Sequence, residues 1–280
     1  MPNQPIDSQP ALPYHRSTGA GPAVVCIHCN ASSSAQWRPL MDQLAPRHLV
    51  LAPDTHGAGR GPAWPAARKL SLSDEVDLLE PLFRHAGEPV ALVGHSYGGA
   101  VALLAALRRP DRVSALVLYE PTLFTLIDAA SPQPNLADGI RETVGRAAAA
   151  LAAGDRRAAA TMFIDYWMGE GAYVAKPEAQ RIAIEDAIVH VQGWLYALLK
   201  DPTPLVAFRA LKMPVLLMQG SETTDSARAV AALLAETLPH VKTLRACPAP
   251  RAPSAAGLGA STPCWLARRY ARAPGAARLR

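Results

Sequence analysis

A single serine lies between two glycines at residues 94–98, where the chain reads Gly-His-Ser-Tyr-Gly. The strand-like apolar run 90–93 precedes it, and the helix-like apolar run 100–106 follows it. Small residues two positions on either side let a buried strand and a buried helix approach closely, so the serine hydroxyl projects from a strained turn. The N-terminus of that helix stabilises negative charge beside the hydroxyl. The pattern therefore predicts that Ser96 is a nucleophile for a carbonyl carbon rather than a serine that only caps a helix.

A serine hydroxyl needs a base that accepts its proton, and histidine is the usual one. The eight histidines stand at positions 15, 28, 48, 56, 85, 95, 190 and 240, so none follows the last predicted strand. His240 directly precedes that strand, which predicts a place at the edge of the sheet opposite Ser96. His56 and His190 are therefore the two histidines that could be recruited as the base.

Continuous apolar runs predict the strands that hold this site, at residues 22–29, 48–54, 89–96, 113–120 and 214–220. Parallel strands that are buried on both faces have such continuous runs. Helix-like segments alternate with them at residues 34–45, 71–86 (with Ser73 at its start), 98–109 and 225–238, and a short strand-like segment follows at 241–245. This alternation predicts an α/β fold with a mostly parallel, doubly wound sheet, preceded by a polar lead with one short strand.

The alternation stops after Glu120, where an alanine-rich, helix-like segment begins. This segment separates the fourth core strand from the fifth, so we expect it to form a helical cap over the carboxyl ends of the strands. The Ala, Pro, Arg and Gly composition at the C-terminus predicts an irregular tail. The predicted parts are a first core part at 1–121, a helical cap at 122–205, a second core part at 206–245 and a tail at 246–280.

These motifs resemble those of the α/β-hydrolase fold superfamily, in its serine hydrolases with a helical cap. The resemblance extends from about residue 11 to 244, and it rests on IHCNASSSAQWRPL, APDTHGAGRG, the serine turn, LVLYEPTLF and MPVLLMQG. It implies that the backbone N–H groups of Asn30 and Tyr97 form an oxyanion hole and that His28 stabilises the turn before Asn30. Cys29 stands where the family has a glycine.

The resemblance leaves three acidic residues as partners for a catalytic histidine. Glu222 and Asp225 follow the fifth core strand, the usual place in the family, but their spacing from Gly220 differs from the common one. Asp225 also fits the N-cap of the next helix. Glu120 ends the fourth core strand, where some branches of the family carry the acid. We therefore expect Glu120 to be the catalytic acid, or otherwise a buried anchor for the cap, with Asp225 and Glu222 as the alternative acids.

The composition narrows the class of partner. Half of the 280 residues are apolar, which suffices for a sizeable core, and no long apolar run predicts a membrane span. The net charge is +5, but residues 245–280 contain seven arginines and no acidic residue, so the charge does not predict a nucleic-acid-binding surface on the folded part. Cys26 and Cys29 have the spacing of half a zinc site without a second pair, which favours small buried thiols. We expect no cofactor, no metal and a cytoplasmic location, and the sequence does not indicate an oligomeric state.

The activity that the resemblance implies is esterase-like, with Ser96 attacking the carbonyl of a small apolar ester. Four aromatic residues of the cap either line the substrate pocket or pack inside the cap: Phe163, Trp167, Trp194 and Tyr196. A serine nucleophile disfavours haloalkane dehalogenase and epoxide hydrolase chemistry. Two alternatives stay open, namely a catalytically silent hydrolase-like binding protein and a cofactor-free haloperoxidase-like or lyase-like enzyme.

The absent histidine and the unusual tail together suggest a hypothesis about the coding sequence. Family members continue after the last strand with a Gly-His loop and a final helix, whereas this chain changes to Ala, Pro and Arg. The segment 251–253, Arg-Ala-Pro, can be encoded CGG GCA CCN, which one base later reads GGG CAC, or Gly-His. We therefore expect that residues from about 246 are read out of frame.

Overall fold

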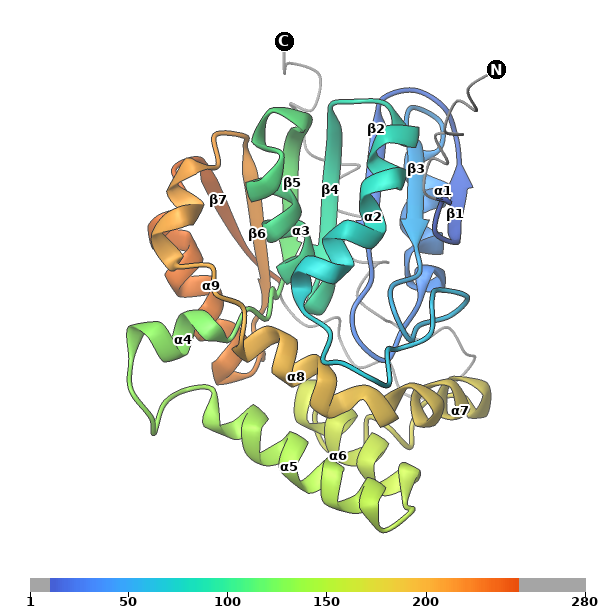
Figure 1. Ribbon diagram of the computed structural model, residues 1–280, viewed down its shortest axis with the longest axis vertical. Helices are drawn as coiled ribbons and strands as arrows, with labels where there is room; N and C mark the ends of the chain where they lie inside the picture. Colours follow the sequence, from blue (N-terminus) through green and yellow to red (C-terminus); the bar gives the residue numbers. More distant parts are fainter. Residues whose placement is uncertain (1–10, 247–280) are drawn as a thin grey trace, which may run out of the picture.

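The computed structural model describes residues 11–246, so the predicted tail beyond Ala246 lies outside the described residues. The strands of its single sheet are β1 (His15–Thr18), β2 (Ala23–Ile27), β3 (Leu49–Pro53), β4 (Val90–His95), β5 (Val113–Tyr119), β6 (Val215–Gly220) and β7 (Val241–Ala246) (Figure 1). Each predicted strand is therefore present, including the short strand of the N-terminal lead.

The seven strands have the order β1-β3-β2-β4-β5-β6-β7. β1 is antiparallel to β3, and all other neighbouring strands are parallel. The chain winds from β2 to β3 in one direction and from β4 to β7 in the other, which confirms the mostly parallel, doubly wound sheet. The winding reverses between β2 and β4, and ligands of such sheets bind outside the carboxyl ends of the strands at that place. Ser96 directly follows β4 there.

Helices cover the two faces of the sheet unequally. One face packs against α2 (Leu72–Ala86), α3 (Tyr97–Arg108) and α9 (Asp225–Thr237) in the larger hydrophobic core. Among residues 11–246, the other face packs against the short η1 (Ser34–Trp37) and α1 (Arg38–Leu44), which fill the single helix predicted at 34–45. The turn η2 (Pro110–Arg112) leads into β5.

The helix α2 begins earlier than the predicted start at Ser73. Its N-cap is Ser71, whose hydroxyl accepts a hydrogen bond from the Asp74 N–H at 3.3 Å, while the Asp74 carboxylate accepts one from the Ser71 N–H at 2.7 Å. This reciprocal pair satisfies two N–H groups that the first turn of a helix leaves without a partner. Ser73 lies inside the first turn instead.

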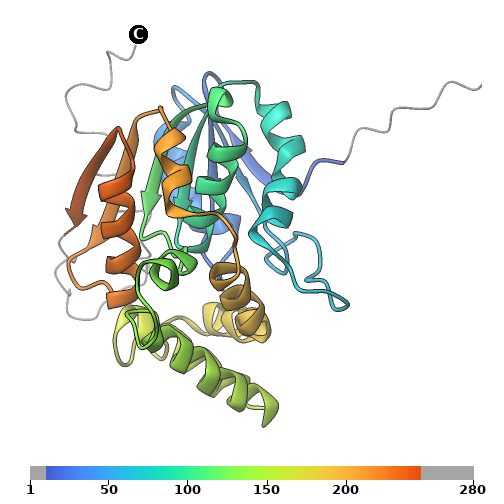
Figure 2. The same ribbon diagram turned by 60° about the vertical axis from the view of Figure 1, so that its left-hand side comes forward.

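The segment between β5 and β6 is helical, and residues 122–205 are termed the helical insertion. It contains α4 (Thr125–Ala130), α5 (Asp138–Ala152), α6 (Arg156–Met168), α7 (Glu178–Ala187), η3 (Ile188–His190) and α8 (Val191–Leu199), and η4 (Leu205–Ala210) leads back to the sheet. In Figures 1 and 2, α5, α6, α7 and α8 lie beyond the end of the sheet where β4, β5 and β6 finish. Contacts of α8 with α3 and of α4 with α9 join the insertion to the core.

One helical run of the insertion, Glu178–Leu199, is long and apolar enough to cross a membrane by length and composition alone. It consists of α7, η3 and α8, and side chains of α8 are buried inside the protein: Val191, Trp194, Ala197 and Leu198. A core helix of a soluble protein passes the same test, so the run carries little weight as evidence of a membrane span.

Candidate active site

Ser96 occupies a strained turn between β4 and α3. Its backbone has φ 54° and ψ −115°, a conformation that costs a residue with a side chain about 1–3 kcal/mol. The Ser96 N–H donates to the Tyr119 carbonyl of β5 at 2.9 Å, and the Ser96 carbonyl accepts from the N–H groups of Gly99 and Ala100, at 2.9 and 3.2 Å. These bonds hold the strained backbone from both sides and place the side chain at the carboxyl end of β4.

The two glycines of the motif permit the close contact of strand and helix. A Cβ atom at Gly94 would lie 2.4 Å from the carbonyl oxygen of Gly98. A Cβ atom at Gly98 would lie 2.3 Å from the carbonyl oxygen of Ile27 and 2.5 Å from that of His28. Real Cβ atoms essentially never approach so closely, so the first turn of α3 packs on β4 only because residue 94 is glycine, and against the end of β2 only because residue 98 is glycine.

The turn after β2 brings Asn30 into this region. The Cys29 N–H donates to the Gln36 side chain at 3.1 Å, and Ala31 has a positive φ of 52°. No hydrogen bond within the described part of the chain uses the backbone N–H of Asn30 or of Tyr97. The two predicted oxyanion donors thus come from segments that touch at Gly98, and both donors are free of other described partners.

His28 is a structural residue of the same turn. Its side chain is buried, its Nδ1–H donates to the Cys29 carbonyl at 2.8 Å, and its Nε2 accepts from the Thr55 N–H at 3.2 Å. Burial lowers the pKa of His28, so the ring is neutral and both its nitrogens are used. This arrangement stabilises the turn before Asn30.

Glu120 lies at the carboxyl end of β5, beside the strand that carries Ser96. Its backbone has a positive φ of 45°, and its N–H donates to the Met218 carbonyl at 2.9 Å. The Oε1 atom of Glu120 accepts from the Gly220 N–H at 2.8 Å. Burial, and to a smaller extent the charge of Glu120, raises the pKa of the neighbouring Tyr119. The carboxylate is therefore held between the ends of β5 and β6, and its hydrogen bond joins two core strands rather than the core and the helical insertion.

The alternative acids lie in different surroundings. Glu222 is exposed, and Asp225 is exposed and paired with Arg228 on its own helix at 3.1 Å. The N-cap of α9 is Thr224, whose hydroxyl accepts from the Ala227 N–H, so the expected capping role of Asp225 is wrong. Neither carboxylate has a described contact with the turn at Ser96.

The two histidines considered as recruited bases have other partners. His56 donates through Nδ1 to Glu75 at 2.9 Å. The ring of His190 is stacked on Trp64 with centroids 5.1 Å apart, and burial lowers its pKa. His240 lies at the end of the strands opposite to the end that carries Ser96, because the His240 carbonyl accepts from the N–H of the first residue of β6. No described hydrogen bond joins any histidine to Ser96 or Glu120.

Glu75 is a residue of this region that sequence reasoning missed. It is fully buried, its Oε2 accepts from His56 Nδ1 and from the His56 N–H, and its Oε1 accepts from the Tyr97 hydroxyl at 3.3 Å. A signal was present, since Leu72, Glu75, Val76 and Leu79 follow the spacing of one helix face. An acidic residue on an apolar helix face indicates a buried polar partner, and Glu75 has two.

The expected aromatic residues of the insertion divide between core and surface. Phe163 and Trp194 are buried, with ring centroids 5.8 Å apart. Trp167 is partly buried and stacks on Phe124 at 6.4 Å. Tyr196 is partly buried, and the Lys69 ammonium lies 4.4 Å from its ring centroid. Trp167 is therefore the one of the four whose contacts reach the segment directly after β5.

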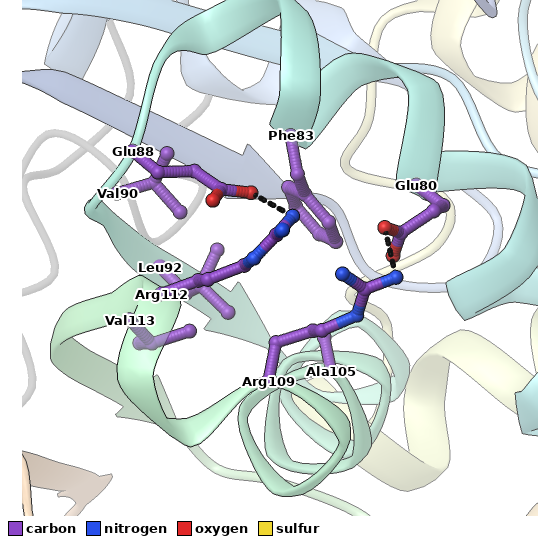
Figure 3. Close-up of a pocket in the computed structure, with 9 residues that line it drawn as sticks. All are labelled: Glu80, Phe83, Glu88, Val90, Leu92, Ala105, Arg109, Arg112 and Val113. Carbon is purple, nitrogen blue, oxygen red and sulfur yellow. Dashed lines mark hydrogen bonds and ion pairs between the residues drawn. The ribbon is translucent and has the colours of Figure 1, made fainter.

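The thiols of Cys26 and Cys29 and the hollow in Figure 3 have no described contact with Ser96 or Glu120. Cys26 is buried and Cys29 half-buried, both are free thiols, and burial raises the pKa of Cys29 to about 12. Residues 11–246 contain no group of three or more His, Cys, Asp or Glu side chains arranged for a metal ion. The hollow in Figure 3 lies at the starts of β4 and β5, between the ion pairs Arg109–Glu80 and Arg112–Glu88, at the opposite end of the strands from Ser96.

Comparisons with known proteins agree with this fold. A family model described as alpha/beta hydrolase fold matches residues 22–251. The chain is 36% identical over 150 residues to Lipase LipV of Mycobacterium tuberculosis, and the match covers 50% of this chain and 56% of that protein. It is 36% identical over 115 residues to a 2-hydroxymuconate semialdehyde hydrolase of a Pseudomonas species, covering 40% and 37%. The chain thus spans only about half, or less, of these curated relatives.

A solved structure resembles the whole described fold. The alpha/beta hydrolase of Sphaerobacter thermophilus has a TM-score of 0.66 and 24% identity, over 92% of this chain and 94% of that one. At this identity the likeness shows the fold alone. The family match covers most of the chain, and it agrees with the sheet order and with the strained serine turn. The chain therefore belongs to the alpha/beta hydrolase fold family.

Proposed function

We propose that this chain has the active site of an esterase-type serine hydrolase, in which Ser96 attacks the carbonyl carbon of a small apolar ester. The observation that carries the proposal is the strained Ser96 backbone, held by the Tyr119 carbonyl and closed in by Gly94 and Gly98. A fold retains such a conformation at a cost in stability, and such residues cluster at functional sites. The names of the two curated relatives, a lipase and a hydrolase, support the same class of reaction.

The attack places a negative charge on the carbonyl oxygen of the ester. In this proposal the N–H groups of Asn30 and Tyr97 donate to that oxygen. The Cys29 N–H is already bonded to Gln36, so the next N–H along the turn is the first free donor. A donor of this kind contributes about 3–4 kcal/mol to the transition state.

Glu120 is proposed as the acid that orients the base. Its carboxylate is anchored at the end of β6, whereas Glu222 and Asp225 are exposed. The helical insertion is proposed as a cap over the site, with Trp167 as the aromatic side chain nearest to the end of β5. A small-molecule substrate, a cytoplasmic location and the lack of a nucleic-acid or membrane partner are parts of the same proposal.

A second candidate function is a hydrolase-like binding protein without turnover. The observation that favours it is that no described hydrogen bond connects a histidine with Ser96 or Glu120. Removal of one member of a catalytic triad leaves a residual acceleration of about 10³–10⁴ over the uncatalysed reaction, which comes from the oxyanion hole and binding. The two candidates therefore differ in whether any Ser96-dependent turnover exists.

The test is hydrolysis of p-nitrophenyl butyrate by the purified chain beside Ser96→Ala. A hydrolase shows slow turnover that Ser96→Ala removes and that the control Ser114→Ala, at an exposed serine of β5, keeps. Mass spectrometry after treatment with a fluorophosphonate shows whether the modified residue is Ser96. Equal rates for the wild type and Ser96→Ala, with no modified Ser96, would contradict the hydrolase and support the binding protein.

A further inference from the structure

The side chain of Gln36 joins the two segments that carry the proposed oxyanion donors. Its Oε1 atom accepts from the Cys29 N–H at 3.1 Å, and its Nε2 atom lies 2.9 Å from Nδ1 of His95. Cys29 directly precedes Asn30, and His95 stands two positions before Tyr97. No other side chain within residues 11–246 has a described hydrogen bond to both segments.

The two neighbours fix the orientation of the Gln36 amide. A backbone N–H can only donate, so the amide oxygen faces Cys29 and the amide NH2 group faces His95. The His95 Nδ1 atom must then accept, which requires a neutral ring that carries its proton on Nε2. Burial, and less strongly the nearby His28, lowers the pKa of His95, so the ring is neutral and keeps this acceptor. The amide therefore accepts from one segment and donates to the other.

The short helix that carries Gln36 is anchored on the core. The Ser34 N–H donates to the buried carboxylate of Asp54 at 2.6 Å, and the side chain of Trp37 is fully buried. Gln36 lies between these two residues in η1, so its amide reaches both turns from a third segment that is held separately. A side chain supported in this way can fix the distance between the two turns that it bonds.

The peptide that carries the Asn30 N–H is held at its carbonyl by His28. This carbonyl, that of Cys29, accepts from the His28 Nδ1–H at 2.8 Å. In a planar trans peptide the N–H points away from the C=O, so this bond sets the direction of the Asn30 N–H. The bond from the Cys29 N–H to Gln36 then sets how far this peptide lies from the serine turn. Direction and separation of the donor are thus controlled by different side chains.

We propose that Gln36 is a positioning residue that sets the separation of the two oxyanion donors, the N–H groups of Asn30 and Tyr97. The inference rests on the proposed function, because it concerns the same oxyanion. Gln36 also occupies the Cys29 N–H, which therefore does not compete for the charged oxygen. A displacement of about 1 Å in an active site can cost about a hundredfold in rate. Loss of the bridge therefore weakens stabilisation of the charged oxygen more than binding of the neutral ester.

The test measures how tightly the full chain binds phenylboronic acid. This acid forms a tetrahedral adduct with a serine oxygen that resembles the charged intermediate, and boron-11 NMR detects it. Gln36→Met has a side chain of similar length without either hydrogen bond, and we expect it to weaken the adduct about tenfold to a hundredfold. Gln43→Met, at an exposed glutamine of α1, is the matched control and keeps the wild-type affinity. Equal affinities of the wild type and Gln36→Met overturn the proposal.

Two substitutions of His95 test the other end of the bridge, and they decide the matter if Gln36→Met does not fold. An asparagine oxygen can accept from the Gln36 NH2 group in place of Nδ1, whereas leucine offers no acceptor. We expect His95→Asn to bind the boronic acid at least about fivefold more tightly than His95→Leu. In the Gln36→Met background, His95→Leu should cause no further loss, because the bond is already absent. Equal affinities of the two His95 variants, or losses that add, overturn the bridge.

Turnover of p-nitrophenyl butyrate separates positioning from damage to the pocket. Gln36→Met should lower kcat and leave KM within about twofold, because the neutral ester does not depend on aligned donors. A raised KM with an unchanged kcat would overturn the positioning role.

The boronic acid also separates this inference from the proposed function. An adduct in the wild type and none in Ser96→Ala supports the nucleophile whatever the Gln36 result. A wild-type adduct that Gln36→Met leaves equally tight overturns the inference alone. If the wild type forms no adduct, the proposed function and the inference are both overturned.

Discussion

Replacing Gly98 by alanine should destabilise the fold and move the two proposed oxyanion donors apart. The added Cβ atom would lie 2.3 Å from the Ile27 carbonyl oxygen and 2.5 Å from the His28 carbonyl oxygen. Both are backbone atoms at the end of β2, so relief requires a shift of the strand or of α3. Inserting an atom into such close packing costs about 1–3 kcal/mol, and the helix propensity of alanine offsets up to about 1 kcal/mol. We expect a net loss of about 1–2 kcal/mol in the free energy of unfolding.

Gly145 provides a matched control for this substitution. It is exposed in the middle of α5, and an added Cβ atom there would meet nothing within 4 Å. Gly145→Ala should therefore raise the free energy of unfolding by about 1 kcal/mol. Urea unfolding of the wild type and of both variants, followed by circular dichroism, compares the transition midpoints.

The result that would refute the steric reasoning is a Gly98→Ala protein as stable as the wild type while Gly145→Ala gains stability. A second readout is boronic-acid binding at Ser96. Because the clash lies between the segments of Asn30 and Tyr97, Gly98→Ala should weaken the adduct, whereas Gly145→Ala should leave its affinity unchanged.

Three further predictions follow from the serine turn and its neighbours. Ser96→Gly should remove any Ser96-dependent turnover yet raise the free energy of unfolding by about 1 kcal/mol, because glycine adopts φ 54° without strain; an unchanged thermal midpoint would contradict this. Burial, and less strongly the nearby His28, lowers the pKa of His95 from 6.5 to about 3. The unfolded chain therefore takes up a proton that the folded one does not, so His95 lowers stability as the pH falls from about 6.5 towards 3, by up to about 1.4 kcal/mol per pH unit. His95→Asn should flatten the measured dependence of unfolding free energy on pH, and an identical slope would show that His95 does not titrate in this way. Tyr97→Phe removes the hydroxyl that donates to buried Glu75 at 3.3 Å. It should lower the free energy of unfolding by about 1 kcal/mol in urea, and an unchanged value would show that His56 alone satisfies the Glu75 carboxylate.

The strands and the nucleophile candidate were predictable because their signals are local. Apolar runs such as 89–96 identify buried parallel strands without any knowledge of their neighbours. The Gly-x-Ser-x-Gly spacing places small residues where strand and helix touch, and the distances at Gly94 and Gly98 show that both positions require them. The helical segment between β5 and β6 was predicted from alanine-rich composition in the same way.

The contacts that shape the site were less predictable because they join distant segments. The hydrogen bond from the Gly220 N–H to Glu120 spans 100 residues of sequence, and only the strand order brings the two together. The bonds of Glu75 to His56 and Tyr97 could not be expected from the sequence, because they depend on how α2 packs against the loop after β3 and the start of α3. The alternative acids at 222 and 225 were chosen because they follow the fifth core strand, the usual place of the acid in the family, and this position does not report exposure to solvent.

The unequal cover of the sheet has a consequence for self-association. Within the described chain, α1 and η1 pack against only part of their face of the sheet, on which Leu216 and Leu244 are partly buried. β7 is the last strand in the described sheet, so one of its sides offers N–H and C=O groups to a strand of another molecule. The exposed side chains of Lys242 and Arg245 lie on this strand, and charge at an edge opposes such pairing. We therefore expect removal of these two charges to favour sheet extension between copies, which would be measured as concentration-dependent aggregation.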